Sequence, residues 1–253
     1  MTATEYVAHW MGEMPFMEAW DLQKQLADEV AKGSHPGTLL LLEHPHTFSL
    51  GRQGQLENLL WSQEELEQHG VTLVWTDRGG NITYHGPGQL VGYPILPLGA
   101  VDRNQHLPQA DYVGYLRRLE DVLIQTLASF GLVSGQIDGK TGVWVQPDIA
   151  SRCRHCPPEA GKRPSKIASI GVKVDAKGVS RHGFSLNVAP DMTYWDGIVA
   201  CGLLDDPAIS MEQLMDSTPA YEEVIEHTIR AFGNVFGVNV ELQPLPGSFL
   251  LRE

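Results

Sequence analysis

The sequence has few cysteines, no long apolar run and no leader-like start. Only three of its 253 residues are cysteine: Cys153, Cys156 and Cys201. An odd, small number in a chain of this length argues against a disulfide framework and for a reducing compartment, so we expect a cytoplasmic protein. No stretch approaches the ~20 apolar residues of a membrane helix. Residues 1–16 lack the basic start and apolar core of a secretory signal. We therefore expect no membrane association.

Positive charge is also scarce. The chain has 18 Lys and Arg against 31 Asp and Glu, for a net charge of −13. Such a chain has no overall excess of positive charge to neutralise phosphates, which argues against a nucleic-acid binder. Eight of the 18 basic residues nevertheless lie between Arg152 and Arg181, where Glu159 and Asp175 are the only acids. This basic segment either faces an acidic partner or is an ordinary solvated loop and strand edge.

The pattern of apolar residues predicts interspersed helices and strands. We expect helices over 15–33, 61–70, 111–131 and 218–237, the last with Pro219 in its first turn, and strands over 38–45, 71–76, 89–98, 142–145, 166–175, 179–188 and 238–242. Several strands follow one another directly, which favours an α+β fold with a mixed β-sheet flanked by helices. Two prolines in 89–98 favour a bent or edge strand. We expect one domain over 1–253, with a surface insertion at 146–165.

The segment from Arg78 to Ile95, RGGNITYHGPGQLVGYPI, combines five glycines with one cation and one histidine. Glycines allow the backbone to approach a ligand closely, and Gly-Pro-Gly makes a tight turn. The segment lacks the lysine of a Walker loop and the spacing of a dinucleotide fingerprint. From the residues alone, a ligand-wrapping loop and a ligand-free hairpin fit it equally well.

Cys201 is a candidate nucleophile if a neighbouring group removes its proton. A lone cysteine beside a glycine is otherwise a small buried apolar residue. His85, His182 and Lys166 are possible partners. His182 and Asn187 belong to one predicted strand, so a Cys-His-Asn arrangement is an open alternative.

The CRHC motif supplies two possible metal ligands, Cys153 and Cys156. A structural zinc site needs four, and no second CxxC exists. His44, His46 or His155 would have to complete it. We therefore expect no metal site, and we expect both cysteines to be dispensable for catalysis.

Four segments resemble, in order, the bacterial octanoyltransferase family, also called lipoyl(octanoyl) transferases. They are EHPHTFSLGRQGQLENLL (43–60), RGGNITYHGPGQLVGYPI (78–95), SKIASIGVKV (165–174) with SRHGFSLNV (180–188), and YWDGIVACG (194–202). The resemblance implies the mixed-sheet fold of lipoate and biotin protein ligases. It also implies octanoyl transfer, without a cofactor, from acyl carrier protein to one lysine of a lipoyl domain. Such domains occur in the E2 subunits of 2-oxoacid dehydrogenases and in the glycine-cleavage H protein.

The same resemblance implies roles for particular residues. It places the nucleophile at Cys201, which would form a thioester acyl-enzyme, and its partner at Lys166. The acyl site would be built from Arg78, Gly79, Gly80, Asn81, Ile82, Thr83, Tyr84, His85, Ser169, Ile170, Gly171, Gly183, Phe184 and Ser185. The chain departs from the family pattern at Ala200, where proline is usual, and in its longer 146–165 insertion.

The expected partners are octanoyl-acyl carrier protein and apo lipoyl domains, and we expect a monomer. Acyl carrier proteins are acidic, so the basic segment is a candidate docking face. Its residues outside the site are Arg152, Arg154, Lys162, Arg163, Lys173, Lys177 and Arg181. The alternatives are an ATP-dependent lipoate-protein ligase, an amidotransferase that moves octanoyl between lipoyl domains, and a non-catalytic acyl-carrier binding module with a switch at Cys153 and Cys156.

Overall fold

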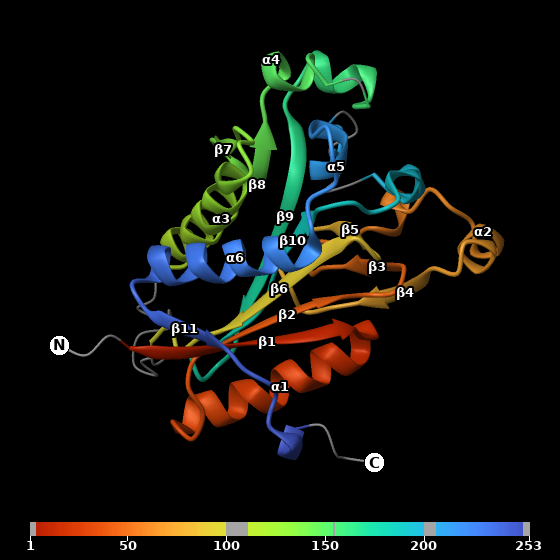
Figure 1. Ribbon diagram of the computed structural model, residues 1–253. Helices are drawn as coiled ribbons and strands as arrows, with labels where there is room; N and C mark the ends of the chain where they lie inside the picture. Colours follow the sequence, from red (N-terminus) through yellow and green to blue (C-terminus); the bar gives the residue numbers. More distant parts are fainter. Residues whose placement is uncertain (1–3, 100–110, 154, 200–205, 250–253) are drawn as a thin grey trace.

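A mixed eight-stranded β-sheet forms the centre of the computed structural model, which describes residues 4–99, 111–153, 155–199 and 206–249 (Figure 1). In spatial order its strands are β11 (Asn239–Leu242), β1 (Glu5–Glu13), β2 (Thr38–Glu43), β6 (Gln89–Ile95), β10 (Ser180–Asn187), β9 (Ser165–Val174), β8 (Lys140–Val145) and β7 (Gly135–Ile137). Strand β1 is parallel to both of its neighbours, and every other pair is antiparallel. The predicted α+β class with a mixed sheet is confirmed.

A three-stranded sheet holds the first half of the glycine-rich segment. Its strands, in spatial order, are β4 (Thr72–Trp75), β3 (Thr47–Leu50) and β5 (Ile82–His85). The side chains of Phe48, Leu50, Ile82 and Tyr84 are buried in one apolar cluster of this sheet. The sequence did not predict β3 and β5, because each has only four residues and carries polar side chains between glycines and prolines.

Three long helices cover the two faces of the large sheet (Figure 1). Helix α1 (Phe16–Lys32) lies on one face, and α3 (Tyr112–Ser129) and α6 (Tyr221–Phe236) lie on the other. Leu39 and Leu41 of β2 pack toward α3 and α6, whereas Leu40 and Leu42 pack toward α1. Alternate residues of a strand point to opposite faces. A strand covered on both faces therefore has an unbroken apolar sequence, here TLLLL.

The helix ends follow local side-chain chemistry. Helix α2 (Gln63–Gln68) has a capping box, in which the Ser62 and Glu65 side chains each accept a hydrogen bond from the other's main-chain N–H. Helix α1 ends at Gly33, whose φ of 74° is a left-handed conformation that glycine adopts freely. The expectation for Pro219 was wrong, because α6 begins at Tyr221 and Pro219 precedes the helix.

Strand β6 is interior, so the edge position, one of the two predicted alternatives, was wrong. It lies between β2 and β10, and Pro94 is paired with Leu39 of β2. The β10 ladder stops at Gly92, so no hydrogen bond from β10 is lost at the proline. Beyond that point the Ser180 hydroxyl donates to the Pro94 carbonyl at 2.8 Å. A proline fits inside this sheet because the neighbouring ladder ends before it.

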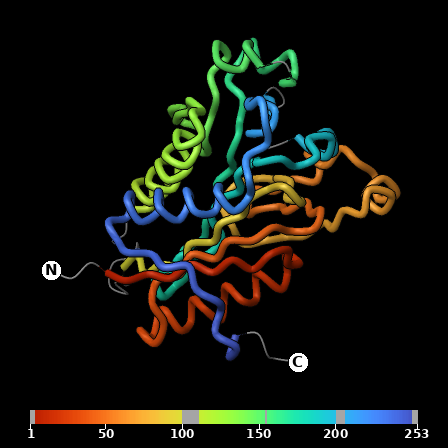
Figure 2. Tube along the Cα trace, viewed as in Figure 1, coloured from red at the N-terminus to blue at the C-terminus, as the bar shows by residue number. Residues whose placement is uncertain are grey.

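Strands β1 and β11, from the first and last parts of the chain, run side by side, as the tube in Figure 2 shows. Strand β11 pairs in parallel with β1, which the sequence did not predict. A short turn, η5 (Gly247–Phe249), follows β11, and Phe249 packs against the cluster beneath α1.

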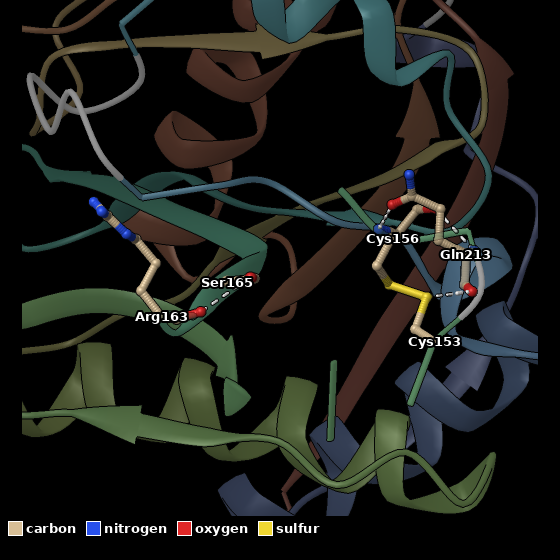
Figure 3. Close-up of a disulfide and its surroundings, with 6 residues drawn as sticks. Cys153, Cys156, Arg163, Ser165 and Gln213 are labelled. Carbon is tan, nitrogen blue, oxygen red and sulfur yellow. Dashed lines mark hydrogen bonds between the residues drawn. A yellow bond between two sulfur atoms is a disulfide. The ribbon is translucent and has the colours of Figure 1, made fainter. Parts of the chain in front are cut away.

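The predicted insertion connects β8 to β9 and extends past the end of the large sheet (Figure 1). It contains helix α4 (Pro147–Ala150) and the turn η2 (Pro158–Gly161). A disulfide joins Cys153 to Cys156, and the Cys153 sulfur lies 3.0 Å from the Gln213 carbonyl oxygen in α5 (Met211–Leu214) (Figure 3). The cysteine count did not predict this bond. Two cysteines three residues apart in a turn can meet without help from the rest of the fold.

Candidate functional site

One cavity gathers residues from separate parts of the chain. Its walls come from the start of α1, the 78–85 segment, β6, β9 and β10. It contains about 510 Å³ of space that no atom occupies, part of it open to solvent. The lining residues are Phe16, Arg78, Gly80, Asn81, Ile82, Thr83, His85, Tyr93, Lys166, Ser169, Ile170, Gly171, His182, Gly183, Phe184 and Ser185.

Every site residue proposed from the sequence lines this cavity, with three exceptions. Cys201 lies outside the described residues. Gly79 lies behind the lining and donates its N–H to the Val172 carbonyl at 2.9 Å. Tyr84 lies elsewhere in β5: its hydroxyl is 3.0 Å from Nδ1 of His46, and its ring stacks on Tyr194. Within β5, then, Ile82, Thr83 and His85 line the cavity and Tyr84 does not.

Strands β9 and β10 bring two of the predicted segments together by their register. Ser169 is paired with Ser185, and Gly171 with Gly183. A Cβ at position 183 would lie 2.1 Å from the Gly92 carbonyl oxygen, so no other residue fits there without moving the backbone. A Cβ at position 171 would lie 3.0 Å from the Gly79 carbonyl oxygen. These glycines allow the 78–81 loop and β6 to approach the two strands closely.

Arg78 fastens one wall of the cavity. Its guanidinium donates to the main-chain carbonyls of Ser49, Gly79 and Asn81 at 2.5, 2.9 and 2.9 Å, and also to the Ser49 hydroxyl. The side chain is buried. A guanidinium holds several oxygens in a fixed planar arrangement. Arg78 therefore ties the glycine-rich loop to β3.

Two buried histidines lie beside this wall. Nε2 of His85 is 3.1 Å from the Ser49 hydroxyl, and burial lowers the pKa of His85 well below its usual value. His44 bonds the Met14 carbonyl through Nδ1 at 2.7 Å and the Tyr93 hydroxyl through Nε2 at 2.6 Å. Because a carbonyl only accepts, Nδ1 carries the proton and Nε2 accepts from Tyr93. Burial lowers the pKa of His44 to about 4. Both rings are uncharged near neutral pH.

A third histidine, His182, forms a pair with Asp77. Its Nε2 lies 2.8 Å from one Asp77 oxygen, and the Arg181 guanidinium lies 2.7 Å from the other. The hydrogen bond from His182, followed by the charge of Arg181, holds the pKa of Asp77 far below its usual range. Burial lowers the pKa of His182 in spite of this carboxylate. The pair orients an uncharged ring at the cavity wall.

The structure does not bring His182 and Asn187 together. The Asn187 amide donates to the Ile209 carbonyl and accepts from the Gln89 side chain. Five residues of a strand span roughly 16 Å, so the two side chains occupy different parts of β10. The Cys-His-Asn alternative loses its third member.

Sequence reasoning missed three lining residues: Phe16, Tyr93 and His182 in this role. Phe16 is the first residue of α1, and its ring packs against His44 and His85 at centroid distances of 4.9 and 5.7 Å. Nothing local marks Phe16 or Tyr93, because both belong to apolar stretches. His182 was considered only as a partner for Cys201. Its φ of 55°, uncommon for a non-glycine residue, is visible only in the fold.

Lys166 enters the cavity from the start of β9, and its side chain is mostly buried. The ammonium nitrogen lies 4.6 Å from the ring centre of Trp144 in β8. The main chain of Lys166 donates to the Pro207 carbonyl at 2.8 Å and accepts from the Ile209 N–H at 3.0 Å. Segment 207–209 therefore runs beside β9 at the lysine, shortly after Cys201 in the sequence.

No described helix is long and apolar enough to cross a membrane. No group of three or more His, Cys, Asp or Glu side chains in the described ranges could hold a metal ion.

Known proteins similar to this chain agree with one another. Residues 15–233 match the family model described as the lipoyl protein ligase A/B catalytic domain. An octanoyltransferase of Chloroflexus aurantiacus is 41% identical over 237 residues, covering 94% of this chain and 96% of the relative. An octanoyltransferase of Acidobacterium capsulatum is 39% identical over 242 residues, covering 95% and 94%.

Solved structures show the same fold at much lower identity. A bipartite lipoate protein ligase of Thermoplasma acidophilum superposes with a TM-score of 0.70 at 14% identity, covering 98% of this chain and 89% of that one. A lipoate-protein ligase A bound with ATP superposes with a TM-score of 0.67 at 15% identity, covering 99% and 92%. The predicted lipoate-ligase-like fold is confirmed.

Proposed function

This chain belongs to the octanoyltransferases of the lipoyl protein ligase A/B catalytic-domain family, and we propose that it moves an octanoyl group from acyl carrier protein to a lipoyl-domain lysine through a thioester on Cys201. Membership makes it an acyltransferase. The acceptors in this proposal are the lipoyl domains of 2-oxoacid dehydrogenase E2 subunits and of the glycine-cleavage H protein.

One observation carries the proposal: Lys166 enters a cavity whose other walls offer little charge. Among the described residues that line it, Arg78 is the only other formally charged group, and its guanidinium is bonded to the protein's own carbonyls. His85 and His182 are uncharged near neutral pH. A saturated eight-carbon chain suits such walls, whereas the phosphates of ATP would call for cations.

In the first half-reaction, Cys201 attacks the thioester carbonyl of the donor. A protonated lysine beside a thiol favours the thiolate, which is the nucleophilic form. The bond from the carbonyl carbon to the carrier sulfur breaks, and Lys166 protonates the departing thiol. The products are an octanoyl-enzyme and a free carrier thiol.

In the second half-reaction, the now neutral Lys166 removes a proton from the incoming lysine amine. The amine attacks the acyl-enzyme, the carbon–sulfur bond breaks, and Cys201 leaves as the thiolate beside a protonated Lys166. An amide replaces a thioester, which is downhill, so this route uses no ATP.

The acyl donor that the protein uses distinguishes a transferase from the rival ATP-dependent ligase. We would incubate the protein with an apo lipoyl domain and either octanoyl-acyl carrier protein or free octanoate with ATP and Mg²⁺. The proposal expects a gain of one octanoyl group on the lipoyl domain only with the carrier-bound donor. Modification only with octanoate and ATP would replace the transferase proposal with a ligase. Octanoyl transfer from one lipoyl domain to another, without carrier protein, would favour the amidotransferase.

A further inference from the structure

The chain is anchored on both sides of residues 200–205. Before them, the Val199 N–H donates to the Asn58 carbonyl at 2.8 Å, in the turn η1 (Leu56–Asn58). After them, the Asp206 carboxylate accepts from Nζ of Lys140 at 2.6 Å. Asp206 is the first described residue after the segment that contains Cys201, and it is followed by the carbonyl that accepts from the Lys166 N–H.

Lys140 belongs to β8, and Trp144 of the same strand contacts the side chain of Lys166. The Lys140 nitrogen lies 5.0 Å from the Trp144 ring centre, and the Lys166 nitrogen lies 4.6 Å from the same point. The two ammonium groups are therefore less than 10 Å apart. Trp144 is fully buried, so the ring is a fixed platform for both cations.

Strand β8 also provides room for the lysine stem at Gly142. A Cβ there would lie 2.6 Å from the Ala168 carbonyl oxygen and 3.3 Å from Cε of Lys166. Gly142 has a φ of 120°, which glycine tolerates, and its N–H donates to the buried Glu120 carboxylate at 2.9 Å. Gly142 and Trp144 of β8 thus determine the direction of the Lys166 side chain.

We propose that the Lys140–Asp206 ion pair positions the two reacting groups relative to each other. It joins the chain that follows Cys201 to the strand that fixes the Lys166 ammonium. The proposal rests on the function proposed above, in which Cys201 and Lys166 act together. The Lys140 side chain is one third exposed, and such pairs add little to stability. The pair therefore acts through geometry, and neither residue touches the reacting atoms.

The test compares Lys140→Met, Asp206→Asn, the double neutral variant and the exchanged pair Lys140→Asp with Asp206→Lys. For each, we would measure kcat and KM for octanoyl transfer and the rate at which iodoacetamide alkylates Cys201, read on its peptide by mass. Small misplacements of reacting groups cost up to about 100-fold in rate. Each single variant is expected to lower kcat about 10- to 100-fold, with KM for the donor changed less than about twofold.

Cys201 alkylation should slow in parallel, because the lysine no longer favours the thiolate. The exchanged pair should recover most of both rates, and the double neutral variant should lose no more than either single variant. Lys177→Met and Asp28→Asn are the controls, and we expect them to leave both rates unchanged. They remove an equally short ion pair, of 2.6 Å, between α1 and the turn that joins β9 to β10. Unfolding midpoints show whether each variant is folded.

Wild-type kcat and alkylation in both single variants would overturn the proposal. So would losses that multiply in the double variant and are not recovered by exchange, since that pattern describes two independent defects. Alkylation needs no octanoyl donor, so a failure of the proposed function is distinguishable. If the proposed function is wrong, the wild-type protein forms no octanoyl adduct. The effect of the Lys140–Asp206 pair on Cys201 alkylation can still be measured in that case.

Discussion

The ammonium nitrogen of Lys166 lies 4.6 Å from the ring centre of Trp144, and the two residues are paired across β9 and β8. A cation over an indole face is held by electrostatic attraction to the ring. Because Trp144 is fully buried, this contact fixes where the amine of Lys166 stands in the cavity. The lysine is therefore held by strand geometry and does not sample the surface as most lysines do.

Lys166→Arg should separate the two half-reactions. Arginine keeps the positive charge but does not lose its proton near neutral pH. Some octanoyl-enzyme should still form, while transfer from Cys201 to the lipoyl domain should fall at least about 100-fold, in line with the loss of a general base. Single-turnover mixing with octanoyl-acyl carrier protein, followed by addition of the lipoyl domain, measures both steps. An active Lys166→Arg with an inactive His182→Ala would favour a cysteine–histidine mechanism.

His44 should make the fold sensitive to acid. Its pKa falls from 6.5 to about 4 on folding, because burial disfavours the charged ring. Between those values the unfolded state binds more protons, so stability rises with pH and is lost as pH falls from 6.5 toward 4. At ~1.4 kcal/mol for each pKa unit, the loss is about 3 kcal/mol of unfolding free energy.

Urea unfolding of the wild type and His44→Gln across this pH range measures the effect. The wild type should lose more stability on acidification than the variant, whatever their difference at neutral pH. Equal pH slopes would mean that His44 does not resist protonation in the fold.

The Cys153–Cys156 disulfide should affect stability and leave catalysis alone. Closing a loop this short stabilises a fold by about 2 kcal/mol at most. Changing both cysteines to serine should lower the unfolding midpoint to the value of the wild type in reductant, with turnover nearly unchanged. A large fall in kcat that reductant also produces in the wild type would instead assign the bridge to the site.

The basic segment is a smaller docking face than its sequence suggests. Arg181 is buried against Asp77, so counting it as available for docking was wrong. Lys177 is exposed and paired with Asp28. Arg154 lies outside the described residues. Arg152 and Lys162 of the insertion are exposed and remain candidates for contact with an acidic carrier protein.

Arg152→Glu with Lys162→Glu should raise KM for octanoyl-acyl carrier protein several-fold, and should leave KM for a small octanoyl thioester unchanged. The effect should shrink as salt rises, because screening reaches to about 8 Å at 0.15 M. Lys24→Glu with Lys32→Glu, on the exposed side of α1, is the matched control. An equal loss with both donors would mean that the insertion supports the active site and is not a docking face.

The sequence predicts those parts of the fold and the site in which function or packing produces a local pattern of residues. The glycine-rich segment and the β9 and β10 motifs were placed from the resemblance, and the structure gathers most of their residues in one cavity. Phe16 and Tyr93 could not be found this way, because an apolar residue in a cavity wall has the same local sequence as one in the core. The interior position of β6 depended on where the β10 ladder stops, which no local pattern encodes.

The most direct test of the proposed mechanism is the mass of the protein after mixing with octanoyl-acyl carrier protein alone. We expect one added octanoyl group on Cys201, located by peptide mass, released by hydroxylamine and discharged by an apo lipoyl domain. Cys201→Ala should show no adduct and no transfer, while Cys201→Ser should transfer slowly or not at all through an oxygen ester. Transfer at the wild-type rate by Cys201→Ala would contradict the covalent mechanism.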